Sequence, residues 1–238
     1  DPKHRYRFGN DVSLFMQVNT EYTNGSRSCI VTDGSWECCV PGEDTSVKAG
    51  GITFANIYDG QTIDARLIDS VWATNHPQTV WKQKAKVVDM PKAHLIPTVN
   101  EPVRAYQPIP AKKLIVTPKG EKVIDFGQNI VGWERVKLSG KKGDQVRITH
   151  AEVLDKDGNF YTENLRSAKC EIEVTSNGVE QIYKPHFSFQ GFRYIKLIGF
   201  NDDEIKLENF TAVVVFSDMK RTGFFACGHE DVQQLYEN

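Results

Sequence analysis

The sequence predicts an all-β protein: two antiparallel β-sandwich, jelly-roll-like domains followed by the start of a helical domain. Two observations predict the sandwiches. Short runs alternate apolar with polar residues along most of the chain, and turn signals separate these runs at hairpin spacing. Because no helix-length pattern lies between the runs, a parallel α/β sheet is excluded. A third observation, an acidic and amphipathic run near the C-terminus, predicts the helix.

The first predicted domain covers residues 1–100. Its first strand alternates from Val12 to Asn19 and leads to Asn24-Gly25, the favoured pair for a tight hairpin turn. Strands are expected at 28–32 and 52–58, with an exposed loop at 41–51 between them. Prolines interrupt the pattern between Asp69 and Pro110, so we expect one edge strand, Trp81 to Val88, and then an extended connection.

The second predicted domain covers residues 101–216, with the boundary near Glu101. Its short alternating runs predict strands at 113–117, 122–126, 132–138, 145–152, 170–175, 181–189, 193–200 and 207–216. Together they are typical of an antiparallel sandwich or jelly roll.

Residues 217–238 predict a connector and the opening of a helix. His229, Glu230 and Asp231 fall in the first turn, and Val232, Leu235 and Tyr236 share one face. Two helical turns are unstable alone in water. We therefore expect the full protein to continue into a helical domain on which this face packs.

Composition excludes several classes of function. The net charge of -2 gives no support for nucleic-acid binding, and no apolar run is long enough to cross a bilayer. The first residues lack the apolar centre of a signal peptide. Two locations stay open: the cytoplasm, or the periplasm or cell exterior if a leader lies outside this sequence. The five cysteines have no Cys-x-x-Cys spacing, which favours free or buried thiols, with Cys170 on the inner face of a strand.

Two constellations have a chemical and a structural interpretation. Asp155 to Asn159 places oxygen ligands at alternate positions, but Arg166 stands where a calcium loop needs its glutamate, so a polar hairpin turn is favoured. His150 and Glu152 share one face of a strand and could pair as acid and base. Since no second carboxylate accompanies them, we favour a hydrogen-bonded structural pair. No metal and no cofactor are predicted.

Polar clusters occur in two further segments. Tyr58 to Arg66 combines two aspartates with an arginine, a set that suits sugar hydroxyls, although a loop tied by an internal Asp-to-Arg salt bridge is favoured. Tyr161 to Ala168 is similar in kind. The aromatic residues from Phe187 to Tyr194 are expected to be mostly core and edge, with Phe187 and Phe189 on one side.

Four motifs resemble one enzyme family in their order and spacing. They are Asp125-Phe126-Gly127-Gln128-Asn129 with Gly132-Trp133, then His150 to Leu154, then Asn159 to Ala168, then Phe187 to Tyr194. Together they resemble the bacterial α-L-rhamnosidases, glycoside hydrolase family seventy-eight. Ile30 to Trp36 and Asn56 to Arg66 resemble the amino-terminal accessory domain of that family, and Arg221 to Cys227 resembles its connector into the catalytic barrel.

The resemblance implies an accessory role. Family members place β-sandwiches before an (α/α)6 barrel, and the barrel holds the two carboxylates that cleave rhamnosides with inversion. No residue here is therefore expected to be catalytic, and the expected partners are that barrel and, through it, a rhamnosylated glycan or glycoside. Candidate contacts to the substrate cleft are Asp59, Asp64, Arg66, Glu163 and Arg166. The alternative is a stand-alone carbohydrate-binding or structural sandwich.

Overall fold

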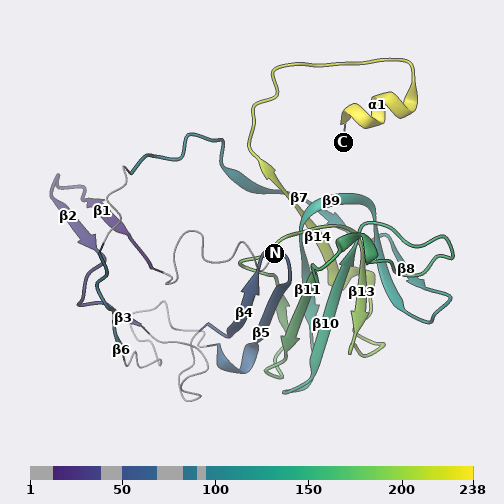
Figure 1. The fold of residues 1–238 in the computed structure, drawn as a ribbon, viewed down its shortest axis with the longest axis horizontal. Coiled ribbons are helices and arrows are strands. Elements are labelled where there is room, and N and C mark those ends of the chain that lie inside the picture. Colours follow the sequence, from purple (N-terminus) through teal and green to yellow (C-terminus); the bar gives the residue numbers. More distant parts are fainter. Residues whose placement is uncertain (1–12, 39–49, 69–82, 90–94, 238) are drawn as a thin grey trace. The chain divides into compact units, whose positions relative to one another are not determined.

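The structure is a computed structural model that describes residues 13–38, 50–68, 83–89 and 95–237. The chain forms two compact units, one of Asp1–Thr53 with Ile63–Ile96 and one of Phe54–Thr62 with Pro97–Asn238. Strands dominate the described residues, in which α1 (Glu230–Glu237) is the α-helix (Figure 1). The all-β prediction and the short terminal helix are confirmed. None of the described helices is long and apolar enough to span a bilayer.

The first unit contains two small sheets. β1 (Gln17–Glu21) pairs with β2 (Arg27–Val31) through the predicted hairpin, in which Gly25 has φ +81° and donates its N–H to the Tyr22 carbonyl at 2.8 Å. β3 (Glu37–Cys38) pairs with β6 (Gln83–Lys84). The edge strand expected at 81–88 is therefore confirmed at Gln83 and Lys84, but its described residues 85–88 form no strand. The exposed loop expected at 41–51 lies outside the described residues except for its last two.

The hairpin of β4 (Ile52–Asn56) and β5 (Gly60–Asp64) extends the large sheet. The order of that sheet is β4-β5-β11-β10-β13-β9-β14-β7, with β8 and β12 pairing to β9 beside this path. The other strands are β7 (Val103–Pro110), β8 (Lys113–Val116), β9 (Lys122–Leu138), β10 (Gln145–Ala151), β11 (Glu171–Thr175), β12 (Gln181–Tyr183), β13 (Gln190–Ile198) and β14 (Phe210–Ser217). The strands from β7 through β14 pair with one another in antiparallel fashion, as predicted.

β9 is the longest strand of the second unit. The sequence predicts two strands, 122–126 and 132–138, separated by a polar corner, but β9 runs through the corner as one strand of 17 residues. Gly127, at φ +79°, absorbs the bend, and a register shift between Phe192 and Tyr194 marks it on β13. At Gly132 a Cβ atom would lie 1.9 Å from the Val213 carbonyl oxygen, so a glycine lets β14 pair closely there.

The extended connection expected before Pro110 is wrong in its last part. Val103 to Pro110 forms β7, which pairs with β14 from Ser217 to Thr211. β7 is the last strand of the sheet order. Pro108 and Pro110 lack an N–H to donate, and an edge strand tolerates this because one of its sides has no neighbour.

Several strand boundaries also differ from the prediction. β12 ends at Tyr183, just before Lys184-Pro185, and leaves residues 184–189 outside regular pairing. Phe187 and Phe189 are 71% and 43% exposed, so their expected place in the core or edge packing is wrong, whereas Phe192 and Tyr194 are buried. β14 begins at Phe210 because the 3-10 turn η4 (Leu207–Asn209) precedes it. Cys170 is buried as expected but precedes β11, with φ +50°.

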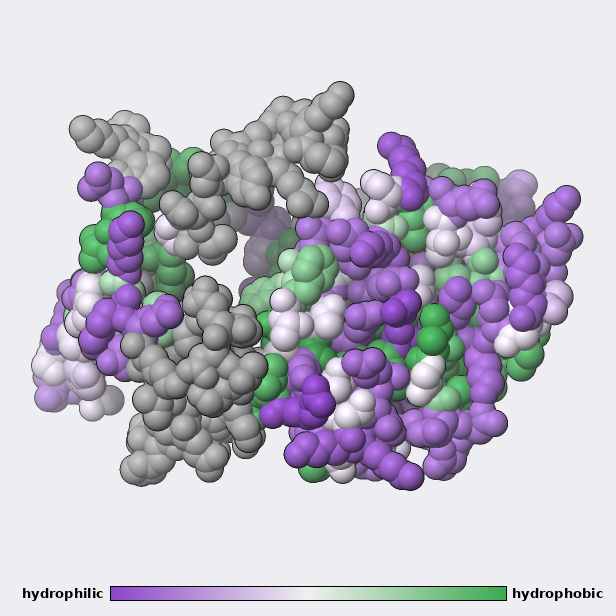
Figure 2. Space-filling view, turned by 60° about the horizontal axis from the view of Figure 1, so that its bottom comes forward, coloured by the Kyte–Doolittle hydropathy of each residue, from purple (hydrophilic) through white to green (hydrophobic). Residues whose placement is uncertain are grey.

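The core of the second unit lies between layers of this curled sheet. Its largest fully buried side chains include Phe126, Phe192 and Phe210, with the Phe126 and Phe192 rings 5.7 Å apart and edge-to-face. On the opposite face of β9, Val123 packs with Ala151, Phe160 and Tyr194. Each buried phenylalanine contributes about 1.5–3 kcal/mol to folding. Hydrophilic residues cover most of the coloured surface in Figure 2, and hydrophobic residues lie between them in small areas.

Candidate functional site

Asp64 and Arg66 form an internal clasp within the first unit. Arg66 Nε donates to Asp64 Oδ1 at 2.8 Å and its terminal nitrogen to Oδ2 at 2.6 Å. Asp64 also caps the 3-10 turn η2 (Ala65–Leu67) by accepting from the Arg66 N–H. Hydrogen bonds from Arg66 lower the pKa of Asp64. The sequence has two interpretations here, a contact to sugar hydroxyls and a loop tied by an Asp-to-Arg salt bridge. The salt bridge is present in the structure.

Asp59 lies in the turn between β4 and β5. Its carbonyl accepts from the Glu171 N–H at 3.0 Å, and its Oδ1 accepts from the Lys169 N–H at 3.4 Å. Gly60 follows at φ +104°, where a Cβ atom would lie 1.8 Å from the Glu171 carbonyl oxygen. Only glycine fits this approach, so the turn carries Asp59 against the start of β11.

Glu163 and Arg166 flank a short turn on the surface. Glu163 is the first residue of η3 (Glu163–Leu165), and Arg166 follows its last residue. Both side chains are exposed, and the Arg166 N–H donates to the Glu163 carbonyl at 3.3 Å. Arg166 has φ +57°, a left-handed conformation. Asp59, Glu163 and Arg166 belong to the second unit, whereas Asp64 and Arg66 belong to the first. The five candidates therefore remain a prediction for the intact protein.

The expected pairing of His150 with Glu152 is wrong. His150 points inward and its Nε2 lies 2.8 Å from Glu134 Oε2, a fully buried partner on β9. Glu152 is half-buried and contacts two amides, Asn129 at 3.4 Å and Asn164 at 3.4 Å. Glu152 lies just past the end of β10, which stops at Ala151, so the period-two rule fails at this position.

The Gly-Gln-Asn corner is held by a charged pair. Asp125 accepts from Arg193 Nε at 2.8 Å, from the Arg193 terminal nitrogen at 3.0 Å and from the Gly127 N–H at 2.6 Å. Burial alone would raise the pKa of Asp125, but these donors lower it overall. The motif therefore has a structural role on β9 and β13.

The Asp155 segment is a hairpin turn. Asp155 Oδ1 accepts from the backbone N–H groups of Asp157 and Asn159 at 2.9 and 2.7 Å, and Leu154 forms a bridge with Phe160. These bonds make the turn of the favoured interpretation. Among the described residues no group of three or more metal-ligating side chains comes together.

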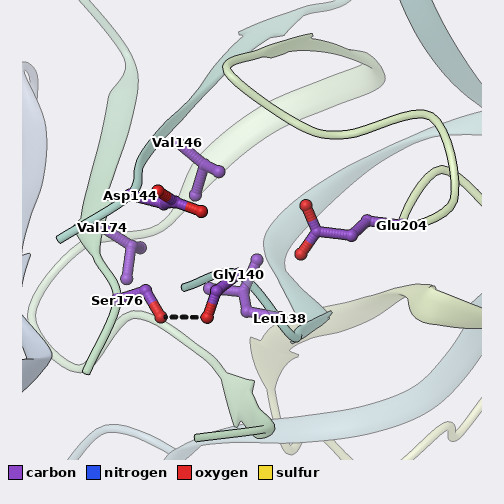
Figure 3. A pocket seen from close by; sticks show the side chains of 7 residues that line it. All are labelled: Leu138, Gly140, Asp144, Val146, Val174, Ser176 and Glu204. Atoms are coloured by element: carbon purple, nitrogen blue, oxygen red, sulfur yellow. Dashed lines mark hydrogen bonds between the residues drawn. The ribbon is translucent and has the colours of Figure 1, made fainter. Parts of the chain in front are cut away.

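A small cavity lies at one end of the large sheet (Figure 3). Its lining includes Asp144, Ser176 and Glu204, and Ser176 Oγ donates to the Gly140 carbonyl at 2.9 Å. The cavity measures about 10 Å³, room for about one water molecule. It is too small for a sugar ring.

Two family models match the chain. The α-L-rhamnosidase N-terminal domain matches residues 1–107, and the bacterial α-L-rhamnosidase concanavalin-like domain matches residues 115–216. The chain belongs to the α-L-rhamnosidase family.

Curated α-L-rhamnosidases are similar over most of this chain. One from Streptomyces avermitilis is 34% identical over 198 residues, which is 82% of this chain and 18% of that protein. One from Formosa agariphila is 31% identical over 230 residues, which is 94% of this chain and 24% of that protein. The chain thus spans about a quarter or less of the length of these relatives.

Solved α-L-rhamnosidases share the fold. The native enzyme from Aspergillus terreus superposes with a TM-score of 0.84 at 32% identity, over 94% of this chain and 25% of that one. The Streptomyces avermitilis enzyme, solved with L-rhamnose, gives 0.82 at 31% identity, over 94% and 21%. Of the features described above, the Asp125–Arg193 pair and the His150–Glu134 pair lie in the concanavalin-like α-L-rhamnosidase domain, and the Asp64–Arg66 clasp lies in the N-terminal one.

Proposed function

We propose that this chain is a non-catalytic accessory segment of an inverting α-L-rhamnosidase, which hydrolyses terminal α-L-rhamnose from glycosides or polysaccharides. The observation that carries the proposal is the coverage: 94% of the chain aligns with only a quarter of a solved relative. The two matched domains are the N-terminal and concanavalin-like ones.

The described carboxyl groups support a non-catalytic role. An inverting glycosidase needs a general acid of raised pKa and a second carboxylate about 6.5–9.5 Å from it. Where the pKa of a described aspartate or glutamate departs from its ordinary value, it is lowered, as at Glu121, Asp125 and Glu204. Glu121 accepts from Lys196 and from the Phe160 N–H, and Glu204 accepts from Ser139 and Asn201. A carboxyl group with a lowered pKa is ionised at neutral pH and is therefore a poor proton donor. The internal hydrogen bonds of these carboxylates instead stabilise the fold.

The proposed partner is the (α/α)6 barrel of the same protein, and α1 offers it a surface. Val232 and Leu235 on this helix are 43% and 76% exposed. On the same face, the Tyr236 hydroxyl donates to the Gly223 carbonyl at 3.0 Å, and its ring lies 4.9 Å from the Arg221 guanidinium. The connector therefore contacts Tyr236 and leaves Val232 and Leu235 available for packing.

The reading frame that follows this segment in the gene tests the proposal. We expect it to encode several hundred residues with helical periodicity, tryptophans and paired acids. A stop codon soon after Asn238, or a domain of another class, would instead favour the stand-alone sandwich.

For the substrate cleft we propose contacts from Asp59, Asp64, Arg66, Glu163 and Arg166 in the intact enzyme. The Asp64→Ala variant tests the loop from Tyr58 to Arg66. Losing the clasp and its cap costs about 1 kcal/mol, a drop of about 2–4 °C in melting temperature. If the loop faces the cleft, kcat/KM on an aryl rhamnoside falls about tenfold or more, beyond what the lost stability explains.

The matched control for Asp64→Ala is Glu21→Ala, which removes an exposed ion pair to Arg27 on the β1–β2 hairpin. It should change neither kcat/KM nor melting temperature. An Asp64→Ala enzyme with normal kcat/KM and a lower melting temperature would mark the loop as a structural clasp.

A further inference from the structure

A buried histidine and a buried glutamate lie within hydrogen-bond distance of each other inside the second unit. The side chains of His150 and Glu134 are 1% and 0% exposed, and 2.8 Å separates Nε2 from Oε2. The other ring nitrogen, Nδ1, lies 2.7 Å from the Cys170 carbonyl oxygen. Because a carbonyl oxygen only accepts, Nδ1 carries a hydrogen. A second proton must lie between Nε2 and Oε2, since a nitrogen lone pair and a carboxylate would repel each other there.

Cys170 connects this pair to the turn that carries Asp59. The Cys170 carbonyl accepts from the ring and from the backbone N–H of His150. On its other side, the Cys170 N–H donates to the Tyr58 carbonyl at 3.1 Å, and the Glu171 N–H donates to the Asp59 carbonyl at 3.0 Å. Cys170 has φ +50°, which costs about 1–2 kcal/mol for a residue with a Cβ atom. These hydrogen bonds hold it there.

The groups around the pair favour the proton. Burial alone would lower the pKa of His150, but the charge of Glu134, the hydrogen bonds to Glu134 and Cys170 and the charge of Glu171 raise it overall. Burial raises the pKa of the Tyr183 hydroxyl on β12 and of the Cys170 thiol. β13 contributes the uncharged Phe192 ring, 5.0 Å from the imidazole.

We propose that the proton shared by His150 and Glu134 fixes Cys170 and, through it, the turn from Tyr58 to Gly60, so that this turn loosens when the pair loses the proton. Glu134 Oε1 is buried and has no hydrogen-bond partner in the described part of the chain. A deprotonated pair would therefore leave a buried carboxylate facing a lone pair with no compensation nearby. The ring or the carboxylate must then move, and the Cys170 carbonyl moves with the ring.

The direction of the pH effect follows from the raised pKa. The contribution of the pair to stability is complete below the unfolded pKa of histidine, about 6.5, and is lost as pH rises through the folded value. The turn should therefore be fixed below about pH 6.5 and loosen as pH rises through the folded pKa of His150.

Hydrogen exchange of the Cys170 and Glu171 amides tests the proposal, because these two amides donate to the turn. In the unmodified chain we expect the protection of the Cys170 and Glu171 amides, corrected for intrinsic exchange, to fall as the His150–Glu134 pair loses its proton with rising pH. The expected fall is about tenfold relative to the Leu197 amide. In Glu134→Gln the side-chain amide donates to a neutral Nε2, which keeps the contact without a titrating proton. Protection in this variant should stay flat. The control Glu152→Gln, at a half-buried position just past the end of β10, should behave as the unmodified chain does.

Equal pH dependence in the unmodified chain and in Glu134→Gln would overturn the proposal. If Glu134→Gln does not fold, NMR of the His150 ring in the unmodified chain decides. Hydrogens on both ring nitrogens at neutral pH, with titration above about 6.5, support it. Titration at or below that value would contradict it. Neither readout depends on rhamnosidase activity, so the result is independent of the proposed function.

Discussion

Asp125 shows how a conspicuous sequence motif acts at the scale of a residue. It sits beside the bend of β9 and joins Arg193 on β13 to the Gly127 N–H, with its side chain 13% exposed. Since its folded pKa is lowered, Asp125 contributes stability above its unfolded pKa of about 3.9, and this is lost as pH falls through the folded value. The pair therefore protects the bend over the whole neutral range.

The Asp125→Ala variant should be destabilised by about 2–3 kcal/mol, because Arg193 and the Gly127 N–H lose a charged acceptor. Urea unfolding at neutral pH measures this loss. Glu180→Ala, which removes an exposed ion pair with Lys137, is the control and should cost less than about 1 kcal/mol. A loss below about 1 kcal/mol for Asp125→Ala would show that the pair does not hold the bend.

The sequence identified the right residue types but not their partners. Alternation pairs His150 with Glu152, yet its partner is Glu134, because β9 and β10 follow each other in sequence but are separated by β13 in the sheet. Alternation predicts which face a side chain takes, but only the register between strands determines what it meets there. The Asp64–Arg66 clasp could be predicted because it forms within one turn, which Asp64 caps, and needs no register between strands.

At the scale of elements, local signals predicted hairpins and missed strands that depend on neighbours. The β1–β2 turn and the Asp155 turn are confirmed, since their residues determine them locally. β7 was missed because its prolines are acceptable only at an edge, and a sequence does not show which strand is last. β9 was divided because Gly127 signals a break, although β13 pairs with β9 both before and after it.

The Gly60→Ala variant tests the join between β5 and β11. Its control is Gly143→Ala, which has a similar φ of +94° but nothing within 4 Å of the new Cβ atom. Backbone strain should cost each variant about 1–3 kcal/mol. Contact with the Glu171 carbonyl should cost Gly60→Ala about 2 kcal/mol more in urea unfolding. Equal losses in the two variants would mean that the turn is not packed against β11.

At the scale of the whole molecule, the two units are interleaved in sequence. Residues 54–62 belong to the second unit, and Gln61 accepts from the Tyr183 hydroxyl at 3.2 Å and from the His186 N–H at 3.1 Å. The domain boundary near Glu101 stays a prediction. Contacts between positions more than 120 residues apart leave no local signal, so the sequence did not reveal that an earlier segment completes the later sheet.

The family could be recognised from spaced motifs, and the expectation that no residue here is catalytic followed from that resemblance. The structure shows that carboxylates such as Asp125 and Glu204 accept hydrogen bonds from internal donors. On the function proposed above, both units are a scaffold for chemistry carried out elsewhere in the protein.

The most direct measurement is hydrolysis of an aryl α-L-rhamnoside by this purified chain, with an intact α-L-rhamnosidase as the positive control. We expect no release of the phenol above the protein-free blank. Turnover that persists after contaminating enzymes have been removed would contradict it.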